Sequence, residues 1–175
     1  MDNKRDKIEE LVWYELVHAK YWEQYISEYT GSKIDWRKWY NIFAILFAIA
    51  GGSTWGLWKA IDFEWITPLM FCLMGIAQAL SAIQKNVIID SETIQSLTKL
   101  RSSYISYFNK LERLFIKIED KQLTKEQIEE EYFVLRETVY PIEELKDTLN
   151  INQLKKIDKK VEMRVIGYLK SRYDI

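Results

Sequence analysis

The chain has 175 residues, 25 of them basic and 26 acidic, and this near-neutral charge excludes a strongly basic nucleic-acid-binding domain and an acidic disordered tail. Its six glycines and two prolines are too few for a sandwich or barrel of many short strands, so we expect an all-α protein. A single cysteine, Cys72, excludes an internal disulfide, and a single histidine, His18, leaves little room for a metal cluster.

Residues 1–35 predict an N-terminal amphipathic helix. Apolar side chains recur at helical spacing between Asp6 and Tyr29. One side carries Ile8, Val12, Ala19, Trp22 and Ile26, and another carries Tyr14, His18, Tyr21, Tyr25 and Tyr29. Aromatic residues on both sides indicate contact with neighbouring helices or with a membrane surface. Gly31 and Ser32 are residue types that end helices, so we expect this helix to stop there.

Residues 36–86 predict a two-span transmembrane hairpin. No charged residue occurs from Trp39 to Trp58 or from Trp65 to Gln84, a length of 20 residues in each case. At about 1.5 Å per residue, a helix of this length spans roughly the 30 Å hydrocarbon core of a bilayer. Tryptophans lie at both ends of the first window, Trp36 and Trp39 at one and Trp55 and Trp58 at the other, and Trp65 begins the second, as in the aromatic belts of membrane helices. The alternative is a pair of wholly buried helices in a soluble bundle, but the chain has little other material to cover them.

The charges around the hairpin predict its orientation. Lys33, Arg37 and Lys38 precede the first window, and Lys85 follows the second. The connector, residues 59–64, carries one lysine and two acids. By the positive-inside rule, both termini lie in the cytosol and the tip of the hairpin faces outward.

Small residues at four-residue intervals in both windows predict close helix packing. They are Ala44, Ala48, Gly52 and Gly56 in the first window and Gly75 and Ala79 in the second. The pattern fits two interpretations, packing of the two spans within one hairpin and association between subunits.

The second window also contains candidate pore-lining residues, Thr67, Phe71, Gln78 and Ser81. Gln78 lies deep in the window, where its amide needs either a hydrogen-bonding neighbour or water. Neither window contains Asp, Glu, Lys or Arg, which weighs against a proton-coupled transporter or a voltage sensor. Because one hairpin cannot enclose a pore, conduction would require a homo-oligomer.

Helical spacing continues beyond the second window. Apolar positions alternate by three and four residues from Ile94 to Ile118, so we expect one helix from Trp65 to about Glu119. An apolar stripe of this length needs partner helices. Arg101 interrupts the stripe and is either a register-setting charge or a ligand contact.

The rest of the chain predicts further helices, which complete a cytosolic helical domain over residues 87–175. Thr124 and Gln127 have the spacing of a helix capping box. Pro141 is expected to end or kink the helix that follows, and Asn150 to cap the last helix of the chain.

Charge is unevenly distributed in this domain. Residues 119–147 contain ten acids and four bases, whereas residues 150–175 contain seven bases and three acids. One interpretation is that the acidic and basic helices face one another as surface ion pairs, each contributing little. The other is that the basic helix binds an anion such as a nucleotide messenger or a lipid headgroup. The residues for that contact would be Lys155, Lys156, Lys159, Lys160 and Arg164.

Motifs for catalysis are absent from the sequence. It contains no glycine-rich phosphate-binding loop, no metal-spaced set of cysteine and histidine, and no histidine-based catalytic constellation. We therefore expect a non-enzymatic protein without catalytic residues, cofactor or bound metal.

The order of these segments resembles the SLATT family, two-transmembrane effectors of bacterial conflict systems. The most specific stretch runs from Tyr104 to Leu149. It contains Tyr-Phe-Asn-Lys-Leu-Glu-Arg-Leu at 107–114, Leu-Thr-Lys-Glu-Gln at 123–127, Glu-Glu-Glu-Tyr at 129–132 and Leu135-Arg136. These motifs are mainly helix-packing patterns, and the family has no shared catalytic residues.

The resemblance implies an oligomeric effector of antiphage defence in the bacterial inner membrane. Such a protein would form a pore or disrupt the membrane when its cytosolic helices receive a nucleotide messenger or the signal of a messenger-sensing protein, and it would bind no nucleic-acid polymer. Two alternatives stay open. One is a non-conducting membrane-anchored scaffold or regulatory subunit, and the other is a membrane protein that itself binds a cyclic oligonucleotide.

Overall fold

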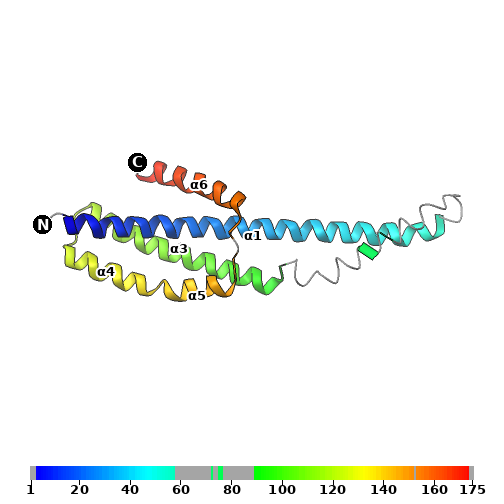
Figure 1. Cartoon of the computed structure of the whole chain (residues 1–175), viewed down its shortest axis with the longest axis horizontal. Coiled ribbons are helices and arrows are strands. Elements are labelled where there is room, and N and C mark those ends of the chain that lie inside the picture. Colours follow the sequence, from blue (N-terminus) through cyan, green and yellow to red (C-terminus); the bar gives the residue numbers. More distant parts are fainter. Residues whose placement is uncertain (1–2, 58–71, 73–74, 77–88, 152, 174–175) are drawn as a thin grey trace. The chain divides into compact units, whose positions relative to one another are not determined.

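The computed structural model describes residues 3–57, 72, 75–76, 89–151 and 153–173, and all regular structure in those residues is helical (Figure 1). The all-α prediction is therefore confirmed for the described part of the chain. The chain divides into two compact units, Met1–Thr30 together with Glu92–Ile175, and Gly31–Ser91.

The core of the first unit forms where α1 (Asn3–Leu57) packs against α3 (Ser91–Glu119). The apolar side predicted for the N-terminal helix is buried at every position, and it also includes Leu16. On α3 the buried side is wider than the predicted stripe, because Leu100, Tyr107 and Leu114 are buried in addition. Helices lie against α3 on more than one side, so a single stripe underestimates its contact surface.

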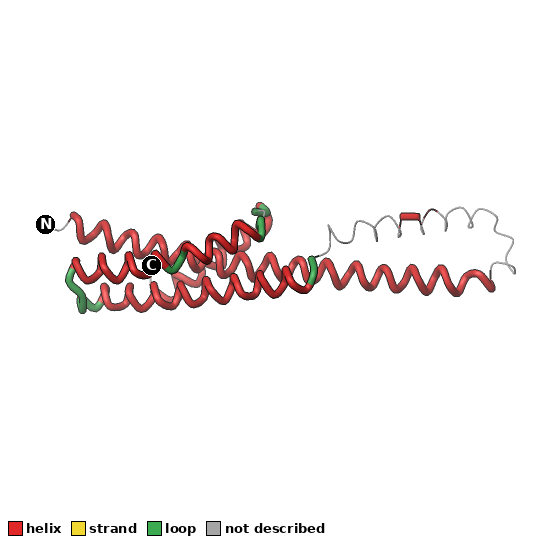
Figure 2. Tube along the Cα trace, turned by 90° about the horizontal axis from the view of Figure 1, so that it is seen from below, coloured by secondary structure: helices red, strands yellow, loops and turns green. Residues whose placement is uncertain are grey.

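The helix α4 (Lys125–Glu137) begins at the predicted capping box. The backbone N–H of Thr124 donates to Oε1 of Gln127 at 2.8 Å, and the backbone N–H of Gln127 donates to Oγ1 of Thr124 at 3.4 Å. Ile128 then packs into a cluster that joins α4 to α1 and α3 and includes Val12 and Leu114. The loop between α3 and α4 is short and reverses the chain direction (Figure 2).

The prediction for Pro141 is confirmed, whereas the one for Asn150 is wrong. Pro141 lies in the first turn of α5 (Tyr140–Thr148), after the end of α4, where its missing N–H costs nothing. Asn150 has a positive φ of 43° and its backbone N–H donates to the carbonyl of Asp147. It therefore ends α5 instead of capping α6 (Lys155–Tyr173), because asparagine tolerates the left-handed conformation that closes many helices.

Within the first unit, α6 lies on one side of the α1 and α3 pair, and α4 and α5 lie on the other (Figure 1). The apolar side of α6 is narrow, with Val161, Val165 and Leu169 buried. Its remaining attachment is aromatic and polar, since Tyr168 meets Phe108 edge-on with ring centroids 6.0 Å apart.

Two predicted helix boundaries are wrong. Gly31 and Ser32 do not end the first helix, because α1 continues to Leu57. A glycine inside a helix costs only about 1 kcal/mol relative to alanine, which adjoining helical residues can offset. The predicted continuous helix from Trp65 to Glu119 is also interrupted, since Ile89 and Asp90 are not helical and α3 begins at Ser91. Asp and Ser favour helix starts over helix interiors because their side chains hydrogen-bond free backbone N–H groups.

In the second unit, α1 exposes large apolar side chains over about half of its circumference. All six residues from Asn41 to Leu46 are exposed, and the large ones among them are Ile42, Phe43, Ile45 and Leu46, at 47–60% of their full surface. Among the described residues, no helix is both long enough and apolar enough to cross a membrane. The second apolar window lies outside the described residues except for Cys72, Gly75 and Ile76, so the transmembrane hairpin over 36–86 stays a prediction.

Candidate functional site

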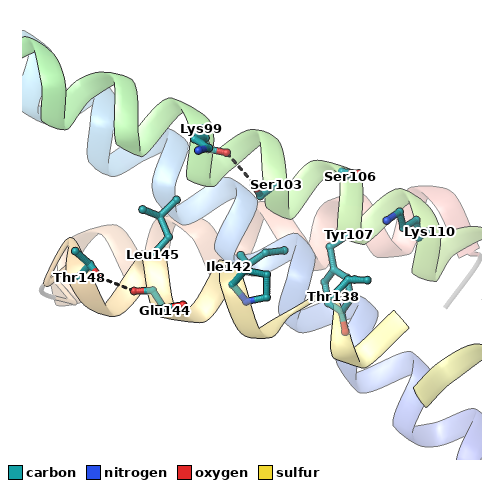
Figure 3. A pocket seen from close by; sticks show the side chains of 11 residues that line it. Lys99, Ser103, Ser106, Tyr107, Lys110, Thr138, Ile142, Glu144, Leu145 and Thr148 are labelled. Atoms are coloured by element: carbon teal, nitrogen blue, oxygen red, sulfur yellow. Dashed lines mark hydrogen bonds between the residues drawn. The ribbon is translucent and has the colours of Figure 1, made fainter. Parts of the chain in front are cut away.

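A groove of about 520 Å³ runs between α3 and the segment formed by the end of α4 and α5 (Figure 3). The α3 side supplies Lys99, Ser103, Ser106, Tyr107 and Lys110, and the opposite side supplies Thr138, Pro141, Ile142, Glu144, Leu145 and Thr148. The groove forms because Pro141 starts a new helix here, so α4 and α5 do not pack on α3 as one continuous helix.

Two lysines mark the two ends of this groove. Lys99 lies toward Leu145 and Thr148, and Lys110 lies toward Thr138 (Figure 3). They are eleven residues apart on one side of α3, about 16 Å at 1.5 Å per residue. Neither lysine forms an ion pair with a carboxylate in the described part of the chain.

The hydroxyl groups of the groove are mostly engaged within the chain. Ser103, Thr138 and Thr148 donate to backbone carbonyls of their own helices, and Tyr107 donates to Glu15 at 3.1 Å. Their oxygens keep lone pairs, but the mobile donors left for a guest are the two lysine ammonium groups and Ser106. With Pro141, Ile142 and Leu145 as an apolar floor, the groove can bind an anion that carries an apolar body.

Arg101, the predicted register or ligand residue, does not line this groove. Its guanidinium lies 3.9 Å from Oε1 of Glu23, a buried carboxylate on α1 that also accepts a hydrogen bond from Lys20 at 2.7 Å. The Lys20 ammonium in turn lies 4.2 Å from the ring centre of Tyr168 on α6. These contacts connect α1, α3 and α6 through charge, which fits the register interpretation of Arg101.

The basic residues of the last helix divide into two groups. Lys160 and Arg164 both pair with Glu28 of α1, and the Lys160 contact measures 2.5 Å. These cations hold the pKa of Glu28 below its usual value. Lys155, Lys156 and Lys159 are exposed and have no ion-pair partner among the described residues.

The expectation that the acidic and basic helices face one another is therefore wrong. The acids of α4 and α5 lie across the α1 and α3 pair from α6, and the partner of Lys160 and Arg164 comes from the N-terminal helix (Figure 1). The sequence did not indicate that Glu28 pairs with α6. Glu28 lies outside the acidic run at 119–147, and its partners Lys160 and Arg164 are 132 and 136 residues away along the chain.

Aromatic hydroxyls add to the contacts that hold α6. Tyr21 donates to Asp158 at 2.7 Å, and the Tyr25 hydroxyl accepts the backbone N–H of Leu154 at 2.9 Å. Burial, the Asp158 hydrogen bond and nearby negative charge raise the pKa of Tyr21 well above its usual value. Both tyrosines lie on the aromatic side that the sequence predicted to contact neighbours.

Most of the predicted packing and pore-lining residues lie outside the region where contacts can be assigned. Ala44, Ala48, Gly52 and Gly56 belong to the helical part of α1, and Ala44 is exposed. Gly75 is a described helical residue with open space around it. The remaining positions, Thr67, Phe71, Gln78, Ser81 and Ala79, lie outside the described residues.

In the described part of the chain, no three histidine, cysteine, aspartate or glutamate residues gather closely enough to hold a metal ion. His18 accepts a hydrogen bond from the Trp22 indole at 2.9 Å, which gives it a packing role on α1. No protein-family model, curated protein or solved structure matches this chain.

Proposed function

We propose that this chain is a non-enzymatic membrane effector that assembles with copies of itself and responds to a signal received by the helices of its first unit. Residues 36–86 would enter the bacterial inner membrane as a two-span hairpin. The response would be the opening of a pore or the disruption of the membrane, as the SLATT resemblance implies.

The observation that carries the proposal is the exposure of Asn41–Leu46 on all sides of α1. Six successive residues make more than one helical turn, so their exposure leaves no side of the helix covered. A helix that works in water normally buries one apolar stripe and presents polar residues elsewhere. Ile42, Phe43, Ile45 and Leu46 extend over about half of the circumference without cover, and an apolar surface of that breadth is stabilised by an apolar environment, which a bilayer supplies.

The groove between α3 and α5 supports a receiving role for the first unit. A nucleotide messenger combines anionic phosphates with flat apolar bases, and the groove combines Lys99 and Lys110 with an apolar floor. The predicted anion contacts on α6 are less suitable, because Lys160 and Arg164 already hold Glu28. A messenger that binds one arrangement of α3 and α5 better than another would shift the population toward that arrangement.

The single cysteine provides a direct test of membrane insertion. Cys72 is exposed in the folded chain, yet it lies within the second apolar window. In inner-membrane vesicles we expect a membrane-impermeant maleimide to label Cys72 only after detergent is added. The matched control is a C72S chain with Lys7→Cys on the exposed N-terminal turn, which should label before detergent on the cytosolic side. Equal labelling of Cys72 before and after detergent would refute insertion.

Ion flux tests the response itself. Liposomes that contain the full chain and an entrapped dye are exposed to a panel of cyclic di- and oligonucleotides. We expect release with one of them, and we expect Lys99→Gln together with Lys110→Gln to abolish it, while the exposed control Lys7→Gln leaves it unchanged. If Cys72 is protected but no nucleotide or partner extract releases dye, the scaffold alternative replaces the pore. Exchange of residues 36–86 for an unrelated hairpin would then leave the scaffold function intact.

A further inference from the structure

Helix α4 presents an acidic ridge to solvent. Glu126, Glu130 and Glu137 are exposed and share the side of α4 opposite to the buried Ile128 and Tyr132. None of the three forms an ion pair with a described residue. Two large apolar side chains flank this ridge, Phe133 at 54% and Val134 at 60% exposed.

Helix α6 presents the complementary pattern. Lys156, Lys159 and Lys170 are exposed on the side opposite to the buried Val161 and Val165, and none has an ion-pair partner in the described part of the chain. Two exposed apolar side chains lie among these lysines, Met163 at 61% and Ile166 at 53%. Each helix therefore offers exposed apolar residues among charges of mostly one sign, negative on α4 and positive on α6, with the exposed Arg136 and Glu162 at the edges of these sides.

The spacing of the two patterns also matches. Shifted by 33 residues, the acids Glu126 and Glu137 of α4 correspond to the bases Lys159 and Lys170 of α6, and the apolar Phe133 between them corresponds to Ile166. The outer charges of both sets are eleven residues apart, about 16 Å along a helix. Two helices with this shared period can bring opposite charges together at both ends of an apolar contact.

Gly167 gives an independent reason to expect a close neighbour on α6. It lies in the interior of the helix, on the exposed side, and a Cβ at this position would meet nothing within 4 Å. An interior glycine costs about 1 kcal/mol relative to alanine, and no packing contact with the described residues requires it. A second helix that approaches closely at Met163 and Ile166 would require the small residue.

The two patterns cannot meet within one chain. Helix α6 lies on one side of the α1 and α3 pair and α4 lies on the other (Figure 1). We propose that the exposed side of α4 binds the exposed side of α6 of a second copy of this chain. Because two different surfaces meet, the contact is heterologous, and an open assembly keeps one free surface of each kind, at its two ends, until a ring closes. The inference rests on the proposed function for its self-assembly, but it requires neither membrane insertion nor conduction.

Directed cross-linking of the full chain in detergent tests this contact. One copy carries Cys72→Ser and Phe133→Cys, and a differently tagged copy carries Cys72→Ser and either Met163→Cys or Ile166→Cys. We expect oxidation to join the two tags with at least one of these partners. The F133C copy alone should give no cross-link, and neither should I166C mixed with the exposed groove variant Ser106→Cys.

Charge reversal then distinguishes association through α4 and α6 from association through the apolar windows. On the copy that carries I166C, Lys159→Glu with Lys170→Glu should lower the cross-linking yield by about tenfold or more. Glu126→Lys with Glu137→Lys on the F133C copy should restore it. Gly167→Leu should lower the yield without lowering the melting temperature, since its surroundings in the single chain are open.

The contact is overturned if F133C joins neither Met163→Cys nor Ile166→Cys, or if F133C copies join each other instead. It is also overturned if charge reversal on one copy lowers the yield and reversal on the other fails to restore it. These readouts do not involve Cys72 labelling or dye release, so failure of the contact and failure of the proposed membrane function remain distinguishable.

Discussion

Replacement of Glu28 by glutamine should loosen helix α6 from the bundle. The Glu28 carboxylate is the shared partner of Lys160 and Arg164, and its side chain is 19% exposed, whereas the two cations are about half exposed. Glutamine keeps the size and the hydrogen-bonding oxygen but removes the charge. The buried apolar side of α6 is narrow, three residues with aromatic contacts from Tyr168 and Tyr173 beside them, so ion pairs add substantially to its docking.

The size of the effect follows from the exposure of the partners. A fully exposed ion pair contributes roughly 0.2–1 kcal/mol, and a largely buried carboxylate places both pairs near the upper end of that range. We therefore expect a loss of about 1–2 kcal/mol, which corresponds to a roughly 5–30-fold increase in the population with α6 detached. Hydrogen exchange of the α6 backbone amides measures this population directly.

The pH dependence has a defined sign. The folded-state pKa of Glu28 is lowered by the two cations, so its contribution is fully present above the unfolded-state value and is lost as the pH falls through the lowered value. In the wild type, the protection of the α6 amides from hydrogen exchange should therefore be constant near neutral pH and decline in the acidic range. The part of this decline that comes from protonation of Glu28 should be absent in E28Q.

The control is Glu162→Gln, which makes the same charge change at an exposed position of α6 without an ion pair to a described residue. It should leave the exchange of α6 within about twofold of the wild type. Unchanged exchange in E28Q, or equal acceleration in E28Q and E162Q, would refute the role of Glu28 as the specific anchor of α6.

Three further predictions concern the stability of the first unit and the adjoining helix, each measured by thermal or denaturant unfolding. Tyr104→Phe removes a buried hydroxyl that has no hydrogen-bond partner among the described residues, so stability should stay constant or rise. Tyr107→Phe, its matched control, loses the hydrogen bond to Glu15 and should cost about 1 kcal/mol; an equal loss in both variants would contradict this. Thr124→Ala removes a capping hydroxyl and should cost about 1 kcal/mol, whereas Thr124→Ser should be nearly neutral. Gly31→Ala should stabilise α1 by about 0.5–1 kcal/mol because the added methyl group meets nothing within 4 Å, and a destabilised variant would show that Gly31 has a packing role.

Features that depend on residues close together in the chain were predicted correctly from the sequence. The capping box at Thr124 depends on two side chains three residues apart, and the buried side of the N-terminal helix depends on a repeat within a few turns. Such patterns report short-range geometry, which is the same in every protein that contains them. The end of α3 at Glu119 was predicted for the same reason.

The helix boundaries were predicted wrongly because the residue preferences that decide them differ by only about 1 kcal/mol. Gly31 weakens a helix but does not end it when neighbouring residues continue it, and Asp90 and Ser91 start a helix where apolar periodicity alone suggested continuity. Residue preferences of this size are decided by the surrounding structure, so a single glycine or aspartate does not determine a boundary.

The sequence alone determined that the chain is helical, which residues of α1 face a core, and how the apolar windows and the charges are distributed along it. Only the tertiary structure decided that Glu28 holds the basic helix, that a groove opens between Lys99 and Lys110, and that the acidic and basic ridges lie on opposite sides of the first unit. The physical reason is distance along the chain. Charges attract at any sequence separation, so their partners are set by the packing of the apolar sides, and that packing leaves the ridges of α4 and α6 turned away from each other.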